Sequence, residues 1–241
     1  MAASNKGTDP DALQGLPAAQ VEFLQALWHG AVGRAVRCVP GRYTVVAEDP
    51  AGRVVFAKLR RGRTRDAAAE WRWLHVLPML GFSVATPVAF LQRGRKTMVV
   101  TEAVVGEAAD TLAHAALANG LGGSPAEFLL RAVAPTVARL HAQGIVFRDL
   151  YWNHLFAPAL GATEPTFLDV ERTFQPRWRR SRWIVKDLAG LLASAPVALP
   201  CRVWLRALHV YQGGRPEGWK ALAKAVRRKA DRIQAHRPRY G

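Results

Sequence analysis

The chain has 241 residues, half of them hydrophobic, so it is long enough and apolar enough to bury a core. It contains 34 Lys and Arg against 18 Asp and Glu, which gives a net charge of +16. No run of 18 apolar residues occurs, which argues against a transmembrane helix. The positive charge favours a polyanionic partner such as nucleic acid, anionic lipid or a phosphorylated glycolipid. A merely Arg-rich, solvated surface would give the same count.

The beginning of the chain carries no sign of secretion. No positively charged start is followed by an apolar run, so we expect no secretory signal. Residues 1–16 are polar and contain Gly and Pro, which predicts a flexible leader. Cys38 and Cys201 lie far apart without metal-ligand spacing, which suits reduced thiols in a cytoplasmic protein.

Residues 17–103 are expected to form a small lobe built on an antiparallel sheet. The hydrophobic patterns predict a helix over 17–30, then strands, a helix and two more strands. The three strands before the second helix are expected over 35–39, 42–47 and 53–58, that helix over 67–77, and the two strands after it over 82–90 and 97–101. The basic run between Arg60 and Arg65 is either a solvated loop or a phosphate-binding segment.

Residues 104–241 are expected to form a mainly helical lobe, with helices over 108–118, 125–142, 183–192 and 204–233, the last with a break at Gly213-Gly214. Ser124 with Glu127 three residues later predicts a capping box at the start of the second helix, and Gly144 predicts its end. A strand is expected over 166–172. The pattern therefore predicts an α+β protein with two lobes.

The stretch from Gly144 to Phe156 contains a polar turn between two apolar pairs, with Asp149 at its centre. A phosphotransferase needs a rigid loop of this kind, because an acidic residue must orient the attacking hydroxyl. Arg-Asp-Leu also occurs by chance, so the motif indicates a catalytic loop only together with other residues of the sequence. Lys58 ends a predicted strand, Glu70 lies on the next helix, and Asp169 follows Asp149 by twenty residues. This order of four residues is typical of kinases.

The sequence resembles the lipopolysaccharide core kinases, the Kdo and heptose kinase family of bacterial envelope synthesis. The likeness runs from about Arg34 to about Ser194. The matching motifs are Phe56-Ala-Lys58-Leu, Ala69-Glu70-Trp71-Arg72, Thr86-Pro-Val-Ala-Phe90, Thr101-Glu102, Arg148-Asp-Leu-Tyr-Trp-Asn-His154, Leu168-Asp-Val-Glu-Arg172 and Trp183-Ile-Val-Lys-Asp-Leu-Ala189.

The resemblance implies a protein-kinase-like, two-lobed fold that uses ATP and Mg²⁺. Asp149 would orient or deprotonate the acceptor hydroxyl, and Lys58, paired with Glu70, would bind the α- and β-phosphates. Asp169 would bind Mg²⁺. We expect Lys58, Asp149 and Asp169 to converge on one nucleotide.

Four further residues of the small lobe are expected to contact the nucleotide. Gly41 and Arg42 lie in the turn that covers the phosphates in this family of folds. Glu102 and Ala103 form the expected hinge, whose backbone groups read the adenine edge.

The second metal contact is expected from His154 or Asn153. Protein kinases have Asn at the position of His154, and imidazole is an unusual ligand for Mg²⁺, so His154 orients phosphate or Asp169 in an alternative interpretation. The sequence departs from the common pattern at two places. Phe147 stands where His is usual, and Val170 with Glu171 replaces Phe-Gly.

The resemblance implies phosphorylation of a heptose or Kdo sugar in the lipopolysaccharide inner core. The partners would be the core glycolipid and an anionic membrane surface, with the protein peripheral on the cytoplasmic face of the inner membrane; no nucleic acid is expected. The segment from Arg177 to Trp183 would grip an acidic saccharide, although its residues alone also suit stacking on RNA. Asp187 is expected to tie its helix to the loop, and His141 to be a core residue.

Two other functions remain open from the residues. One is phosphorylation of a protein or a small molecule. The other is a degenerate kinase fold that binds an anionic partner and transfers nothing.

Overall fold

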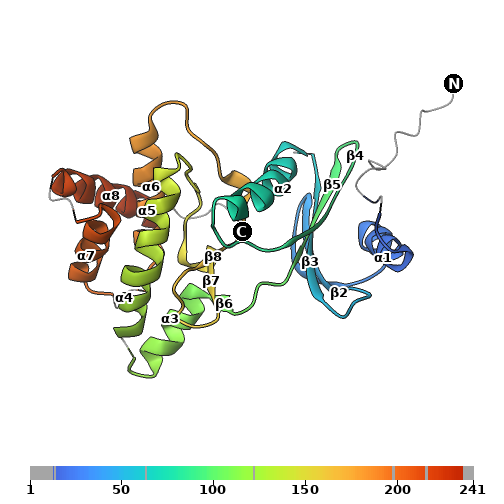
Figure 1. Cartoon of the computed structure of the whole chain (residues 1–241), viewed down its shortest axis with the longest axis horizontal. Coiled ribbons are helices and arrows are strands. Elements are labelled where there is room, and N and C mark those ends of the chain that lie inside the picture. The colour runs from blue at the N-terminus through green and yellow to red at the C-terminus, as the bar shows by residue number, and fades with distance from the viewer. Residues whose placement is uncertain are drawn as a thin grey trace. The chain divides into compact units, whose positions relative to one another are not determined.

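The computed structural model describes residues 13, 15–62, 64–121, 123–196, 199–214 and 217–235. Most of the expected leader over 1–16 lies outside these residues. The chain divides into two compact units, Met1–Val104 and Val105–Gly241 (Figure 1). Each unit is described separately below.

The first unit contains a five-stranded antiparallel sheet in the order β1-β2-β3-β5-β4. The strands are β1 Arg34–Val39, β2 Arg42–Glu48, β3 Val54–Arg61, β4 Pro87–Arg93 and β5 Lys96–Glu102. The fourth strand was expected from residue 82, but pairing starts at Pro87, which lies opposite Thr101 near the end of β5. Thr86 accepts a hydrogen bond from the N–H of Glu102, the last residue of β5, so β5 ends before residues 82–85 could pair with it.

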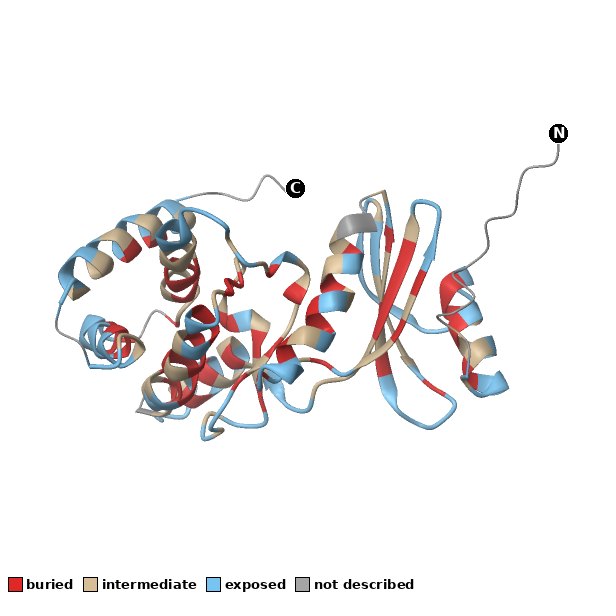
Figure 2. Ribbon diagram, turned by 45° about the horizontal axis from the view of Figure 1, so that its top comes forward, coloured by how far each residue is buried: buried red, intermediate tan, exposed pale blue. Residues whose placement is uncertain are grey.

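The two faces of this sheet are covered by different helices, α1 (Ala18–His29) and α2 (Thr64–Met79), as Figures 1 and 2 show. Val55 and Ala57 of β3 are fully buried in a core cluster with Leu24 and Leu27 of α1. Because side chains alternate along a strand, Lys58 lies on the opposite face, toward α2. One face of the sheet is thus apolar and packs on α1, and the other carries the polar side chain of Lys58.

The described part of the second unit contains six α-helices and a small three-stranded sheet, which α3 contacts. The helices are α3 Ala109–Ala118, α4 Gly123–Phe128, α5 Ala134–Ala142, α6 Arg180–Ala193, α7 Cys201–Tyr211 and α8 Trp219–Gln234, and the strands are β6 Glu107–Ala108, β7 Leu155–Ala157 and β8 Thr166–Phe167. Helix α6 packs along α8, and α5 packs against α7 (Figure 1). Large side chains fill the interior, among them Phe128, Trp152 and Phe167. Among the described residues, no helix combines the length and apolar composition needed to cross a bilayer.

The helix expected over 125–142 differs from the prediction in two ways. It begins at Gly123, so Ser124 lies inside the first turn, and the capping-box assignment was wrong. A π-helical segment, Leu129–Val133, separates α4 from α5. Pro135 follows in the first turn of α5, where its missing N–H breaks the regular hydrogen-bond ladder, and the wider π turn accommodates that loss. The helix ends before Gly144 (φ 78°), as predicted.

The strand expected over 166–172 is much shorter in the structure. It ends at Phe167, and Asp169 adopts a left-handed backbone (φ 59°, ψ 50°) that extended pairing cannot contain. A 3₁₀ turn, Val170–Arg172, follows. Asp169 therefore lies on a sharp turn after the strand, with Arg172 at the end of that turn.

Candidate functional site

The loop around Asp149 is held by buried neighbours. Ile145, Val146 and Phe147 before it are fully buried, and Leu150 after it is too. Val146 also exchanges two backbone hydrogen bonds of 3.0 Å with Phe174. These contacts fix the backbone on both sides of Asp149, as the apolar flanks predicted.

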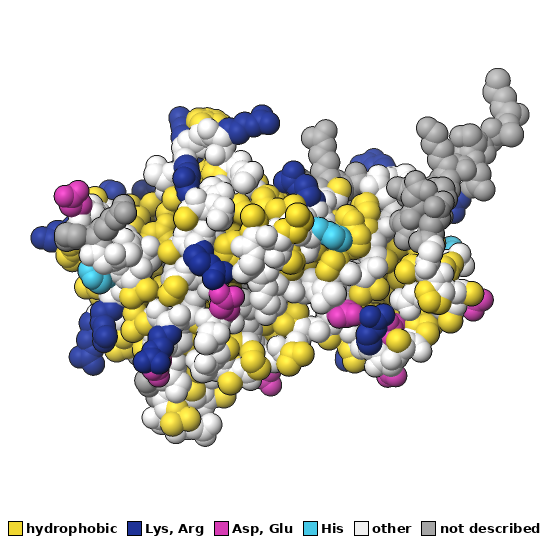
Figure 3. Space-filling model, in the orientation of Figure 1, with side chains coloured by type: hydrophobic (Ala, Val, Ile, Leu, Met, Phe, Trp, Pro, Cys, Tyr) yellow, Lys and Arg dark blue, Asp and Glu magenta, His cyan; other side chains and the backbone are white. Residues whose placement is uncertain are grey.

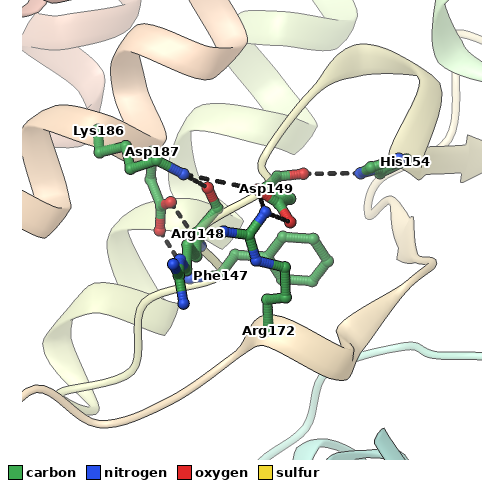
Figure 4. A network of polar contacts seen from close by, with 7 residues as sticks. All are labelled: Phe147, Arg148, Asp149, His154, Arg172, Lys186 and Asp187. Atoms are coloured by element: carbon green, nitrogen blue, oxygen red, sulfur yellow. Dashed lines mark hydrogen bonds and ion pairs between the residues drawn. The ribbon is translucent and has the colours of Figure 1, made fainter. Parts of the chain in front are cut away.

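Asp187 of α6 holds the backbone of the loop by hydrogen bonds. Its side chain is 0% exposed, and its two oxygens accept the backbone N–H groups of Phe147 and Arg148, each at 2.6 Å (Figure 4). The predicted tie between this helix and the loop is confirmed. Arg148 has a φ of 74°, a conformation that costs a non-glycine residue about 1–3 kcal/mol. The two hydrogen bonds from consecutive amides offset that cost.

Asp187 also belongs to a buried polar chain. His141 Nε2 lies 3.2 Å from Asp187 Oδ2, and His141 Nδ1 lies 2.9 Å from the Tyr211 hydroxyl. Since a carboxylate only accepts, His141 Nε2–H donates to Asp187, and the Tyr211 hydroxyl is hydrogen-bonded to the other ring nitrogen. Burial raises the pKa of Tyr211 to about 12. The prediction that His141 is a core residue is confirmed.

Two cations converge on the carboxylate of Asp149 (Figure 4). Arg172 Nη1 lies 3.0 and 2.8 Å from the two oxygens, and Lys186 Nζ of α6 lies 3.5 Å from Oδ1. Lys186 also donates to the backbone carbonyl of Arg148. Burial lowers the pKa of Lys186, and the charge of Asp149 partly opposes that shift. Asp149 is 17% exposed, so its carboxylate is oriented by protein groups and still reaches solvent.

His154 and Asn153 occupy a 3₁₀ turn just after Asp149. His154 Nδ1 donates to the backbone carbonyl of Asp149 at 2.7 Å, so only its Nε2 remains for a metal or a phosphate. Asn153 is exposed. The ring of Tyr151 meets the His154 ring edge-on, with centroids 5.8 Å apart. His154 thus braces the loop backbone on the side opposite Asp187.

The residues after β8 fit a hard divalent cation. Asp169 and Glu171 each offer a carboxylate oxygen, and these two oxygens lie within 4.8 Å of each other. Carboxylate oxygens are ligands that Mg²⁺ prefers. Glu171, which departs from the usual kinase pattern, therefore adds a suitable donor instead of removing one.

In the first unit, Glu70 of α2 pairs with two cations from β3. Lys58 Nζ lies 2.6 Å from Glu70 Oε1, and Arg60 Nη2 lies 3.2 Å from Oε2. The predicted Lys58–Glu70 ion pair is present. The basic run from Arg60 to Arg65 was left open between a solvated loop and a phosphate-binding segment. The side chain of Arg60 is only 7% exposed, because it lies on the same face of β3 as Lys58. The side chains of Arg63 and Arg65 lie outside the described residues.

The other expected nucleotide contacts also lie in the first unit. Gly41, with a φ of 75°, forms the turn between β1 and β2, and Arg42 opens β2. At the end of β5, the N–H of Glu102 donates to Thr86 and that of Ala103 to Val54. The Glu102 carboxylate accepts from Arg53 at 2.7 Å. The N–H groups of Glu102 and Ala103 are therefore both paired within the first unit.

Sequence reasoning missed two residues that contact Asp149. Arg172 closes the motif Leu168–Arg172, but an expected strand would have pointed it elsewhere, and only the turn after Asp169 brings it to the loop. Lys186 directly precedes Asp187 on α6. Neighbouring helical residues point about 100° apart, so both can reach one loop, and that spacing was the available signal.

Comparison with known proteins supports a kinase-like architecture. Residues 28–211 match the profile of the Lipopolysaccharide kinase (Kdo/WaaP) family. A solved structure of WaaP in complex with acyl carrier protein is similar at 26% identity and a TM-score of 0.69, covering 88% of this chain and 97% of that one. The macrolide 2'-phosphotransferase MphH from Brachybacterium faecium shares the fold, at 16% identity and a TM-score of 0.57, covering 86% and 87%. Comparison with curated protein sequences found no match.

Proposed function

Because the chain belongs to the lipopolysaccharide kinase (Kdo/WaaP) family, we propose that it transfers the γ-phosphoryl group of ATP to a heptose or Kdo hydroxyl of the lipopolysaccharide inner core. The chain is a phosphotransferase with a kinase-like fold. The observation that carries the proposal is the loop of Asp149, whose backbone and carboxylate are both held from several sides. Phosphoryl transfer depends on positioning of this kind more than on covalent chemistry.

In this proposal Asp149 orients the acceptor hydroxyl and accepts its proton. The ion pair with Arg172 fixes the carboxylate, so that one oxygen faces the acceptor in a defined direction. His154 and Asp187 hold the backbone on either side. The loop then needs no rearrangement when the acceptor arrives, which is the condition for efficient transfer.

Lys58 binds the α- and β-phosphates, with Glu70 keeping its side chain in place. Gly41 and Arg42 cover the phosphates, and backbone groups of Glu102 and Ala103 contact the base. Asp169, with Asn153 or His154 Nε2, holds Mg²⁺, and Glu171 is added here as a further candidate ligand. The ion, when bound, would neutralise charge on the transferred phosphoryl group.

The acceptor and the location are part of the same proposal. Trp178 is 69% exposed, and the guanidinium of Arg179 lies over its ring at 4.5 Å. An exposed tryptophan among arginines suits the interface of an anionic membrane. The protein would therefore work as a peripheral protein at the cytoplasmic face of the inner membrane, where the core glycolipid is assembled.

The decisive test combines an enzyme assay with analysis of the product in cells. Purified protein is incubated with ATP, Mg²⁺ and core oligosaccharide, and phosphate transfer is compared with that of Asp149→Asn and of the exposed control Asp231→Asn. We expect a loss of about 10²–10⁴-fold for Asp149→Asn and no change for the control. Mass spectrometry of core oligosaccharide from cells with and without the gene then identifies the acceptor. An unchanged phosphate count would remove the proposed substrate.

The same assay separates two alternatives. Transfer to a protein or a small molecule, with none to core oligosaccharide, would identify a kinase with another acceptor. No ATP-dependent transfer to any of these acceptors would indicate a degenerate kinase fold that binds an anionic partner.

A further inference from the structure

A basic cleft of about 860 Å³ lies between α6 and α8, entirely within the second unit. Figure 3 shows Lys and Arg dispersed over the face it draws. The lining of the cleft, in contrast, is rich in them. The cationic residues that line it are Arg148, Arg182, Lys186, Arg228, Lys229 and Arg232. No acidic residue is among its lining residues. We call these six residues and the hollow they surround the α6–α8 cleft.

Most cations of the cleft form no ion pair with a described residue. Among the described residues, none forms an ion pair with Arg182, Arg228 or Arg232, whereas Arg227 on another side of α8 pairs with Asp231 at 2.9 Å. The Nε atom of Arg148 is buried and finds no hydrogen-bond acceptor among the described residues. A buried donor without an acceptor is costly, and an anionic ligand would supply the missing acceptor.

The cleft also contains an aromatic platform. The guanidinium groups of Arg148 and Arg182 lie 5.6 and 5.4 Å from the centroid of the Trp183 ring. Leu222 and Ala225 of α8 add apolar surface. An aromatic ring beside several guanidinium groups suits a phosphorylated sugar. The sugar ring would pack on Trp183, and its phosphates would accept hydrogen bonds from the arginines.

The size of the cleft and its position limit the kinds of ligand that it can bind. Its volume is that of a small-molecule site, whereas a lipid surface or an acidic protein needs a broad exposed face. Lys186 lines the cleft and lies 3.5 Å from the Asp149 carboxylate. A ligand in the cleft therefore lies one side chain away from the proposed catalytic group.

We propose that the α6–α8 cleft binds the anionic groups of a saccharide that carries two or more phosphates. This inference rests on the proposed function and deepens it, because it identifies the groups by which the acceptor is held. Trp183, Arg228 and Arg232 would then determine acceptor affinity, while Lys58 and Asp169 act on the nucleotide.

The test is direct binding of a probe by the full chain, without ATP. The probe is a soluble, deacylated glucosamine disaccharide with two phosphates, and its dephosphorylated form is the comparison, both measured by titration calorimetry. The cleft variant Arg228→Gln/Arg232→Gln is compared with Lys224→Gln/Arg227→Gln, which removes the same charge from exposed positions of the same helix outside the cleft lining. Thermal unfolding confirms that each variant is folded.

We expect the bisphosphorylated probe to bind, the dephosphorylated probe to bind at least about 10-fold more weakly, and the cleft variant to lose about 10-fold in affinity per arginine. The control variant should stay within about twofold, because screened exposed charges contribute little. Equal losses in both variants, or equal binding of both probes, would overturn the inference. So would a cleft variant that loses binding to phosphatidylglycerol vesicles or to an acidic carrier protein while it keeps the disaccharide.

The outcome is independent of phosphoryl transfer. Selective binding by a chain that transfers no phosphate would support the cleft and remove the proposed function. If the chain transfers phosphate to core oligosaccharide but binds both probes equally, the proposed function stands and the inference about the cleft is wrong.

Discussion

Arg172 contacts both carboxylate oxygens of Asp149 through a single nitrogen, at 3.0 and 2.8 Å. We predict that Arg172→Ala lowers kcat by about 10–100-fold, because a carboxylate held by Lys186 alone loses its alignment with the acceptor. Arg172→Lys should recover part of the loss, since it keeps the charge. Steady-state kinetics measure both. Arg139→Ala, which breaks the exposed pair with Glu164, is the control, and an Arg172→Ala enzyme with unchanged kcat would contradict the positioning role.

Removal of the Asp187 side chain should destabilise the second unit. Asp187→Ala leaves two amide N–H groups and His141 without their acceptor in a buried place. We expect the free energy of unfolding to fall by about 3–5 kcal/mol, as for other broken buried pairs, with a smaller loss for Asp187→Asn. Urea unfolding followed by circular dichroism measures it. The exposed control Asp231→Ala should change stability by less than about 0.5 kcal/mol, and an equal effect of the two would refute the assignment.

Lys58→Met should separate nucleotide chemistry from folding. Arg60 keeps its contact with Glu70 in this variant, so the ion pair that anchors α2 is not lost entirely. We expect kcat/KM for ATP to fall by about 10²–10³-fold, the usual effect of removing one charge-stabilising donor. Thermal unfolding should change little. A Lys58→Met protein that turns over ATP like the exposed control Lys224→Met would contradict the proposed phosphate contact.

The buried Tyr211 predicts a pH effect at alkaline pH. Its pKa is raised from 10.0 to about 12, so the folded state favours the neutral phenol. The associated stability is fully present below pH 10 and is lost as pH rises from 10 toward 12, because the unfolded chain gives up the proton first. Two pKa units correspond to about 3 kcal/mol as an upper figure.

Tyr211→Phe should flatten this part of the stability profile. Urea unfolding at intervals between pH 9 and 11.5 compares it with the unchanged chain and with Tyr43→Phe, whose ring is exposed. If Tyr211→Phe and Tyr43→Phe give the same pH slope, the buried hydroxyl does not carry the effect.

Local sequence patterns predicted most of the elements and the buried supports of the loop. Alternation placed Lys58 on β3, and the apolar flanks of Asp149 predicted a fixed loop. The patterns failed where tertiary contacts override local preference. Asp169 reads as strand from its apolar neighbours, yet its left-handed backbone turns the chain and brings Arg172 to Asp149. The π-helical segment before Pro135 was likewise not predicted.

The cations around the site show a second limit of sequence reasoning. Nothing in the local sequence distinguishes Arg228 and Arg232 from Arg227. Only the packing of α8 on α6 assigns them to a cleft that Lys186 and Arg148 share. Long-range packing, which composition and periodicity do not encode, therefore decides which charges act together.

The unfavourable backbone conformations of Arg148 and Asp169 bear on how this protein can change. Both residues have positive φ, at 74° and 59°, where glycine would be the relaxed choice. Selection for heat tolerance alone would favour glycine at either place, and would discard a guanidinium of the cleft or a carboxylate beside Glu171. Variants that gain thermal stability from glycine at Arg148 or Asp169 should therefore lose activity. At these two positions, stability and activity favour different residues.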